Sequence, residues 1–263
     1  LEIFRYDKLI SLTVSFLIIL GGIGFVTVNS LFIIKKKKLK NLSLTSKFAL
    51  LITFFLLTFG TMLFLVLEYN NSSTLKGMNF VDKIINSFFQ SVTLRTAGFN
   101  TVPLENIRPA TVFISYIFMF IGASPGSTGG GIKTTTFGIL IFYAFGVLKR
   151  KEYVEVFKRR IDWELINKAL AIVIMSLFYI IVVITILLSI ESFSADKVIY
   201  EVISAFSTTG LSMGITASLG IISKFLIIIT MFIGRLGPMT VALAFTNNKK
   251  SLVKYPKEDI LIG

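Results

Sequence analysis

Apolar stretches long enough to cross a lipid bilayer as helices make up most of this sequence. A helix needs about 20 residues to span the hydrocarbon core of a bilayer. Five stretches reach that length: residues 9–34, 48–67, 110–148, 169–190 and 219–245. Only 16% of the residues are charged, whereas about a quarter are charged in a soluble domain. The sequence therefore predicts an all-α polytopic membrane protein and excludes a disordered chain and a nucleic-acid-binding domain.

Two of these stretches contain interruptions. The third is almost twice too long for one crossing, and a glycine-rich segment breaks it between residues 122 and 138. The fifth carries the sequence GRLGP, residues 234–238, in its middle. Non-helical backbone at membrane depth is tolerated only where protein buries it or where it lines a wet cavity. Both breaks are expected to line a cavity; a plain packing kink is the alternative for residues 122–138.

Two shorter helical segments, residues 82–93 and 196–207, have only 12 residues each. Such a helix is about 18 Å long, roughly half a bilayer. Each is followed by a polar turn that contains glycine, and then by a full apolar span. The order of helix, half-helix, turn and helix predicts a re-entrant pore loop.

The chain repeats this unit. The sequences DKII and DKVI begin the two half-helices at Asp82 and Asp196, and TAGF at residues 96–99 corresponds to TTGL at residues 208–211. A further similarity links residues 21–28 to residues 234–241, so the first span looks like the closing helix of an earlier repeat.

These similarities divide the chain into four parts. Residues 1–40 are the closing helix of a second repeat with a basic loop, residues 41–161 a third repeat, residues 162–250 a fourth repeat, and residues 251–263 a cytoplasmic tail. The fragment would thus hold two full repeats and the closing helix of another, arranged around a central pore.

The polar turns are candidate cation-binding sites. Glycine at the third position of each turn permits backbone dihedrals that aim successive carbonyls the same way, and a row of carbonyls can replace the hydration shell of a cation. The negative end of the half-helix dipole also favours cations. The alternative is a pair of ordinary helix-breaking turns. The candidate filter residues are Thr96, Ala97, Gly98, Phe99, Thr208, Thr209, Gly210 and Leu211.

The glycine-rich segment is not a nucleotide-binding loop, because Ile132 stands where a Walker motif has glycine and no strand precedes it. Lys133 and Arg235 lie inside apolar stretches, where a cation costs about 2.5–3.5 kcal/mol unless it is solvated or paired. No acidic residue lies within the five spans. Both cations are therefore expected to face a wet interior.

Charge predicts the orientation of the chain in the membrane, and composition argues against enzyme activity. Basic residues gather in three clusters, at residues 35–40, 149–160 and 249–257, and the positive-inside rule assigns these loops to the cytoplasm. The chain has no Cys and no His, so it lacks a disulfide framework, a thiolate nucleophile and the usual zinc or haem ligands. We expect no enzyme activity and no cofactor.

Four motifs occur in a characteristic order: SVTLRTAGFNT at residues 91–101, IGASPGSTGGGIKTTTF at 121–137, SAFSTTGLSMGIT at 204–216 and IGRLGP at 233–238. Together they closely resemble the Trk/Ktr/HKT potassium transporter superfamily. The second motif is most similar to KtrB, the type of membrane subunit found in bacterial Ktr systems. Members of this superfamily have four helix–pore-loop–helix repeats around one pore.

The resemblance implies potassium uptake across the bacterial plasma membrane, with potassium bound at the filter residues only. It implies that an intramembrane gate is formed by Gly126, Ser127, Thr128, Gly129, Gly130, Gly131, Lys133 and Arg235. It also implies a homodimer in membrane lipid with a cytosolic, nucleotide-binding regulatory ring.

The sequence departs from the superfamily pattern at two positions. Leu94 replaces a common proline and Thr209 replaces a usual valine. Neither replacement removes a glycine or a carbonyl group, so only the fine selectivity among cations is open. The alternatives are a non-conducting scaffold, a membrane-enzyme subunit that retains the fold, and a sodium-permeable cation transporter.

Overall fold

The computed structural model describes residues 1–33, 42–151 and 153–244. In this part of the chain, two helices are long and apolar enough to cross a membrane, α3 (Leu44–Glu68) and α7 (Trp163–Ile190). A third crossing is possible if α1 (Lys8–Ile23) and α2 (Phe25–Ile33) count as one bent span. The shorter apolar helices are α5 (Pro109–Phe120) and α6 (Thr134–Leu148).

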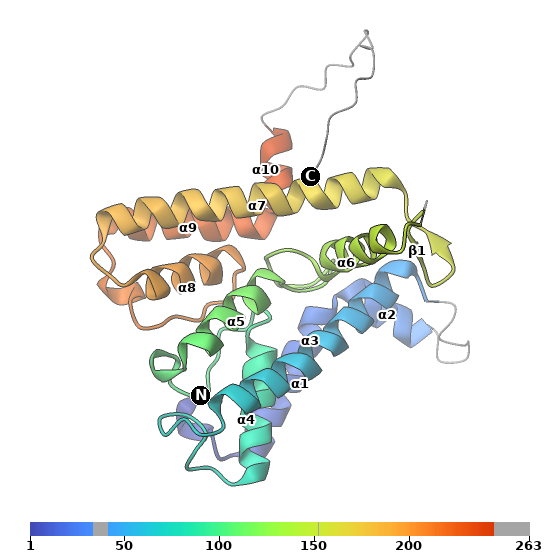
Figure 1. Cartoon of the computed structure of the whole chain (residues 1–263). Coiled ribbons are helices and arrows are strands. Elements are labelled where there is room, and N and C mark those ends of the chain that lie inside the picture. Colours follow the sequence, from blue (N-terminus) through green and yellow to red (C-terminus); the bar gives the residue numbers. More distant parts are fainter. Residues whose placement is uncertain (34–41, 152, 245–263) are drawn as a thin grey trace.

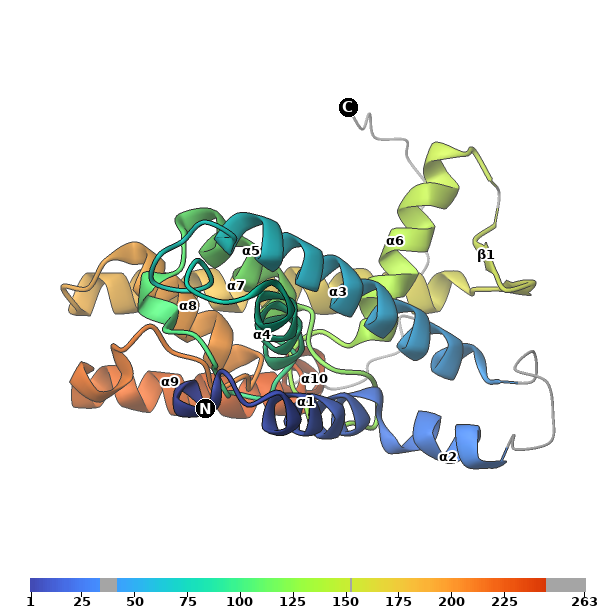
Figure 2. The ribbon, with the colours of Figure 1, turned by 90° about the horizontal axis from the view of Figure 1, so that it is seen from below.

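A long helix, a short helix and a further helix follow one another twice. The first series is α3, α4 (Phe80–Thr93) and α5, and the second is α7, α8 (Ala195–Phe206) and α9 (Ile221–Leu236). Figure 1 shows α7 and α9 running alongside each other with α8 packed against both. Figure 2 shows α4 nearly end-on between α3 and α1, both of which it contacts. The two short helices lie within two residues of the bounds expected for the half-helices.

The expectation that residues 9–34 form one uninterrupted helix is wrong. The helix breaks at Gly24, where α1 and α2 meet at an angle of 94°. Gly24 has a φ of 88° and a ψ of 139°, and a Cβ atom there would lie 2.4 Å from the carbonyl oxygen of Pro125. Gly237, between α9 and α10 (Pro238–Ala244), has nearly the same dihedrals, a φ of 88° and a ψ of 133°. The two glycines hold matching places in residues 21–28 and 234–241, so the sequence similarity coincides with a similar break.

The glycine-rich break ends earlier than expected. Helix α5 ends at Phe120 and α6 starts at Thr134, so Gly138 belongs to a helix instead of the break. A Cβ atom at Gly138 would lie 2.6 Å from the Phe48 ring on α3. Small residues let membrane helices approach closely, and this glycine serves that purpose.

A short hairpin joins α6 to α7, which the all-α expectation did not include. Strands β1 (Glu155–Val156) and β2 (Arg159–Arg160) pair in an antiparallel register. Phe157 and Lys158 between them both have positive φ, as in a type I′ turn. Three single turns of 3-10 helix complete the described elements: η1 (Glu2–Phe4), η3 (Leu104–Asn106) and η4 (Thr216–Ser218).

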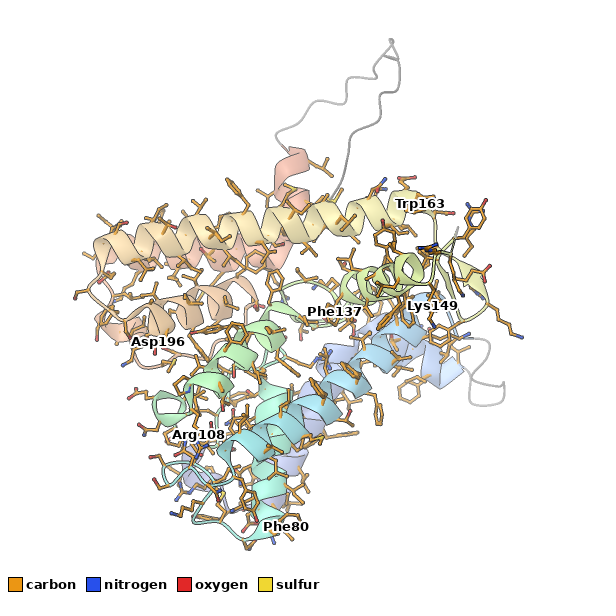
Figure 3. All side chains as sticks on the ribbon, in the orientation of Figure 1. Phe80, Arg108, Phe137, Lys149, Trp163 and Asp196 are labelled. Carbon is orange, nitrogen blue, oxygen red and sulfur yellow. The ribbon has the colours of Figure 1, made fainter. Side chains whose placement is uncertain are left out.

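The described residues of one basic cluster, 149–151 and 153–160, lie at one end of the molecule. Figure 3 shows Lys149 and Trp163 at that end, and Phe80, Arg108 and Asp196 well away from it. The clusters at residues 35–40 and 249–257 and the tail at residues 251–263 lie outside the described residues.

Each series of three helices, α3–α4–α5 and α7–α8–α9, forms a helical unit in which a carboxylate links the first helix to the third. Glu68, at the end of α3, is fully buried and accepts hydrogen bonds from the backbone amide of Arg108 at 2.9 Å and from the Thr111 hydroxyl. Glu191, directly after α7, accepts one from the backbone amide of Gly220 at 2.9 Å. In each unit a carboxylate at the end of the first helix therefore caps the start of the third. The sequence analysis did not identify these residues, although each is the first acidic residue after its span.

Candidate functional site

The two glycine turns, residues 96–99 (the first turn) and 208–211 (the second turn), lie against each other. A Cβ atom built on Gly98 would be 2.7 Å from the carbonyl oxygen of Thr209, and one built on Gly210 would be 3.5 Å from the Cα atom of Gly98. Residues 112 positions apart in the sequence therefore meet at the point where both turns carry glycine. No side chain fits at Gly98 unless the neighbouring backbone moves.

Both turns share an unusual backbone. Thr96 and Thr208 have φ values of 65° and 55°, and Gly98 and Gly210 have φ values of 77° and 84°. Positive φ is a genuine outlier for a β-branched residue such as threonine. Such strain costs about 1–3 kcal/mol per residue and is concentrated at functional sites. The same strained conformation in two turns indicates a functional constraint.

The glycine-rich loop packs directly against these threonines. A Cβ atom on Gly129 would lie 2.2 Å from Oγ1 of Thr96, and one on Gly130 would lie 2.6 Å from Oγ1 of Thr208. The backbone amide of Gly130 donates a hydrogen bond to Oγ1 of Thr208 at 2.8 Å. Only residues without a side chain can bring the loop this close to both turns.

The first part of the glycine-rich loop, residues 124–126, is hydrogen-bonded to the break between α1 and α2. The backbone amide of Ser124 donates to the carbonyl oxygen of Gly22 at 2.9 Å, and that of Phe25 donates to the carbonyl oxygen of Gly126 at 3.0 Å. Within the loop, Gly126 and Gly131 have positive φ, and the amide of Gly129 lies 3.4 Å from Oγ of Ser127. The sequence analysis did not predict the contacts with residues 22–25.

A cavity of about 470 Å³ lies between α1 and the first turn. Thr96, Ala97, Phe99 and Thr128 contribute to its lining, together with Arg95 and residues of α1. Arg95 is only 3% exposed, and its Nε and Nη2 atoms have no hydrogen-bond partner among the described residues. In the second turn, Thr209 and Leu211 are buried.

Lys133 and Arg235 line a second cavity, of about 170 Å³. The Lys133 ammonium group donates a hydrogen bond to the carbonyl oxygen of Gly129 at 2.7 Å and so stabilises the loop. No carboxylate lines this cavity in the described part of the chain. The cavity thus holds two cationic side chains, one of which is bonded to the loop that touches both turns.

The two turns, residues 96–99 and 208–211, contain no carboxylate. Among the described residues, no group of three or more His, Cys, Asp or Glu side chains could hold a metal ion. The turns instead offer carbonyl and threonine hydroxyl oxygens, the ligand type of potassium filters.

Apolar helices of spanning length that enclose irregular, strained turns define an integral membrane protein. The chain belongs to the TrkH family of cation transport proteins, whose family model matches residues 1–255. The resemblance to the Trk/Ktr/HKT superfamily is thus confirmed.

Individual relatives agree with this assignment. The chain is 38% identical over 260 residues to Ktr system potassium uptake protein B of Vibrio alginolyticus, covering 99% of this chain and 57% of that protein. It is 38% identical over 259 residues to potassium/sodium uptake protein NtpJ of Enterococcus hirae, covering 96% of this chain and 57% of that protein. The chain therefore spans little more than half the length of these relatives.

The fold matches that of a solved transporter. The crystal structure of the potassium transporter TrkH from Vibrio parahaemolyticus superposes with a TM-score of 0.77 at 18% sequence identity. The match covers 91% of this chain and 52% of that one.

Proposed function

We propose that this chain forms part of a potassium uptake protein in which its two glycine turns supply half of a carbonyl-lined selectivity filter. The observation that carries the proposal is the contact between Gly98 and Gly210, in turns that share the same strained backbone. Two turns of one conformation, each placed after a short helix, provide equivalent carbonyls around a common axis.

The short helices support the binding of a cation. Helix α4 ends at Thr93 and α8 ends at Phe206, two or three residues before the turns begin. The C-terminal end of a helix carries about half a negative charge. Both helix ends therefore favour a dehydrated cation near the turns.

The proposed pore needs more than this chain. Two turns cannot surround an ion, and the family resemblance implies four repeats. We assign residues 41–161 to the third repeat, residues 162–250 to the fourth, and residues 1–40 to the closing helix of the second. The remaining turns would come from sequence that the longer relatives contain, since this chain spans only 57% of the two described above.

We assign the gate to Gly126, Ser127, Thr128, Gly129, Gly130, Gly131, Lys133 and Arg235. The Gly130–Thr208 hydrogen bond holds the loop against the second turn, and Gly129 packs against Thr96 of the first turn. The four glycines of the loop allow several backbone shapes of similar energy. Lys133 and Arg235 add positive charge beside the loop. The loop would thus act as a steric barrier and the two cations as an electrostatic one.

The same proposal covers orientation and partners. Residues 149–160 would face the cytoplasm of a bacterium, by the positive-inside rule, and the protein would be embedded in plasma membrane lipid. The name of the Vibrio relative refers to a Ktr system, which supports a complex of several components. We propose a homodimer that binds a cytosolic, nucleotide-binding regulatory ring.

Ion uptake by the complete transporter tests this function. Expressed in a bacterium that lacks its own potassium uptake systems, it should restore growth at low potassium and accumulate rubidium. Sodium uptake should be measured in parallel, because the Enterococcus relative is named a potassium/sodium uptake protein. Absence of any cation uptake by well-expressed protein would favour a non-conducting scaffold.

A further inference from the structure

Different side chains form the hydrogen bonds that hold the C-terminal ends of the two turns. In the first, Oγ1 of Thr93 accepts a hydrogen bond from the backbone amide of Phe99 at 3.1 Å and donates one to the carbonyl oxygen of Phe99. The offset of 112 residues that aligns the turns places Ala205 opposite Thr93 and Leu211 opposite Phe99. Alanine has no hydroxyl group, so the second turn needs another means of support.

Glu201 on α8 provides this support. Its side chain is buried, with 6% exposed, and its Oε2 atom accepts a hydrogen bond from the Ser212 hydroxyl at 2.7 Å. Its Oε1 atom accepts one from the Thr216 hydroxyl at 2.5 Å. Ser212 directly follows Leu211, and its Oγ atom also accepts a hydrogen bond from the backbone amide of Gly214 at 3.1 Å. One carboxylate therefore anchors the segment that leaves the second turn.

This carboxylate has no counterpart in the first turn, where the same alignment places Phe89 opposite Glu201. Neither of the ion pairs found among the described residues, Lys8–Asp82 and Lys168–Glu164, includes it. A buried carboxylate that is not paired with a cation is costly unless hydrogen bonds and a nearby positive charge compensate it. Two hydroxyl groups supply part of that compensation.

The rest can come from the transported ion. Ser212 and Thr216 line a cavity of about 480 Å³, whose wall also includes Glu2, Asn100 and Glu105. The Glu201 carboxylate lies directly behind the two hydroxyl groups of this wall. A cation that enters the cavity experiences the charge of Glu201 in addition to that of the lining carboxylates, and Glu201 keeps the adjacent backbone in place.

We infer that Glu201 is a positioning residue that sets the preference of the second turn for potassium over sodium. The inference rests on the proposed transport function. Selectivity among cations depends on how firmly the oxygen ligands are held and on the field that they produce. Removing the charge of Glu201 weakens its hydrogen bonds to Ser212 and Thr216, and so changes both factors.

The test is Glu201→Gln in the complete transporter, with potassium and sodium uptake measured at matched membrane amounts. We expect the potassium-to-sodium uptake ratio to fall about tenfold and the apparent KM for potassium to rise, which corresponds to the lower end of the range for losing a hydrogen bond to a charged group. Glu68→Gln is the matched control, because Glu68 is also buried and its carboxylate accepts hydrogen bonds from hydroxyl and amide groups. None of its partners lies in either glycine turn or in residues 212–216, the segment that leaves the second turn. This variant should therefore lower the Tm and leave the potassium-to-sodium uptake ratio unchanged.

A double-mutant cycle separates positioning from general destabilisation. Ser212→Ala should lower the ratio by itself, and adding it to Glu201→Gln should produce little further change, because both remove one interaction. If Glu201→Gln does not accumulate, Ser212→Ala and Thr216→Val take its place, each removing one hydroxyl group.

An unchanged ratio in the folded variants would overturn the inference, as would an equal change in Glu68→Gln or full additivity in the cycle. A parent protein without potassium uptake would instead overturn the proposed function.

Discussion

The backbone amide of Gly130 and the hydroxyl group of Thr208 are joined by a hydrogen bond of 2.8 Å, although 78 positions separate them in the sequence. This bond links the glycine-rich loop of one helical unit to the strained turn of the other. Gly129 packs closely against Thr96 of the other turn. Movement of the loop away from the turns must therefore break a contact with each unit.

Replacing Thr208 with valine tests whether this bond holds a gate closed. Valine has nearly the same shape but cannot accept the bond, whose loss corresponds to about 1 kcal/mol. We expect the maximal potassium uptake rate of the Thr208→Val transporter to rise about fivefold. Thr209→Val is the control, because the buried Thr209 hydroxyl has no partner among the described residues. Equal rates in the two variants would show that the bond does not restrain the loop.

Gly98→Ser tests the proposed filter. Serine at this position must adopt a φ of 77°, which costs about 1–2 kcal/mol, and its Cβ atom would lie 2.7 Å from the carbonyl oxygen of Thr209. We expect the potassium-to-sodium uptake ratio to fall about tenfold, and Gly210→Ser to act similarly. Gly77→Ser is the control, because a Cβ atom there meets open space. A normal ratio in well-expressed Gly98→Ser protein would contradict the filter assignment.

Arg235→Ala and deletion of residues 126–131 test the two barriers. A positive charge about 6 Å from a passing cation costs about 3 kcal/mol at an effective dielectric constant of 20. Arg235 is exposed in its cavity, and water there reduces this cost. We therefore expect potassium uptake by the Arg235→Ala transporter to rise about tenfold, and uptake by the deletion variant to rise as well. Selectivity should change little in either variant. Arg150→Ala, outside the cavity, is the matched control. Complete loss of uptake in both correctly folded variants would show that these residues keep the pore open or intact.

Glu191 predicts a pH dependence of stability. The Ser223 hydroxyl and the Gly220 amide hold the pKa of the Glu191 carboxyl below its ordinary value of 4.5. Because the folded state favours the ionised form, the stabilisation is complete above about pH 4.5 and is lost as the pH falls through the lowered pKa. The Tm difference between the parent protein and Glu191→Gln should thus be largest near neutral pH and shrink in acid. A difference that grows in acid would contradict this sign. Glu155→Gln, which alters an exposed hairpin carboxylate, should not change the Tm.

Helix positions were largely predictable, because apolar length and residue chemistry act locally. The short helices lie within two residues of the predicted bounds because half-span length, polar caps and glycine turns are visible along the chain. Asn79, for example, accepts a hydrogen bond from the amide of Asp82 at 2.8 Å at the start of α4. The break at Gly24 was missed, although its similarity to Gly237 was visible, because a glycine inside an apolar run is compatible with a continuous helix.

The membrane class, the family, the helical segments and the two glycine turns could be predicted from the sequence, since each depends on composition or on residues close together in the chain. The contact of Gly98 with Gly210, the hydrogen bond of Gly130 to Thr208 and the hydrogen bonds of Glu201 to Ser212 and Thr216 became visible only in the folded structure. The first two contacts join residues from different helical units, and their distances depend on how those units pack. The third depends on side-chain geometry after the turn is folded. Neither kind of contact leaves a periodic signal in the sequence, so packing and hydrogen bonding decide both.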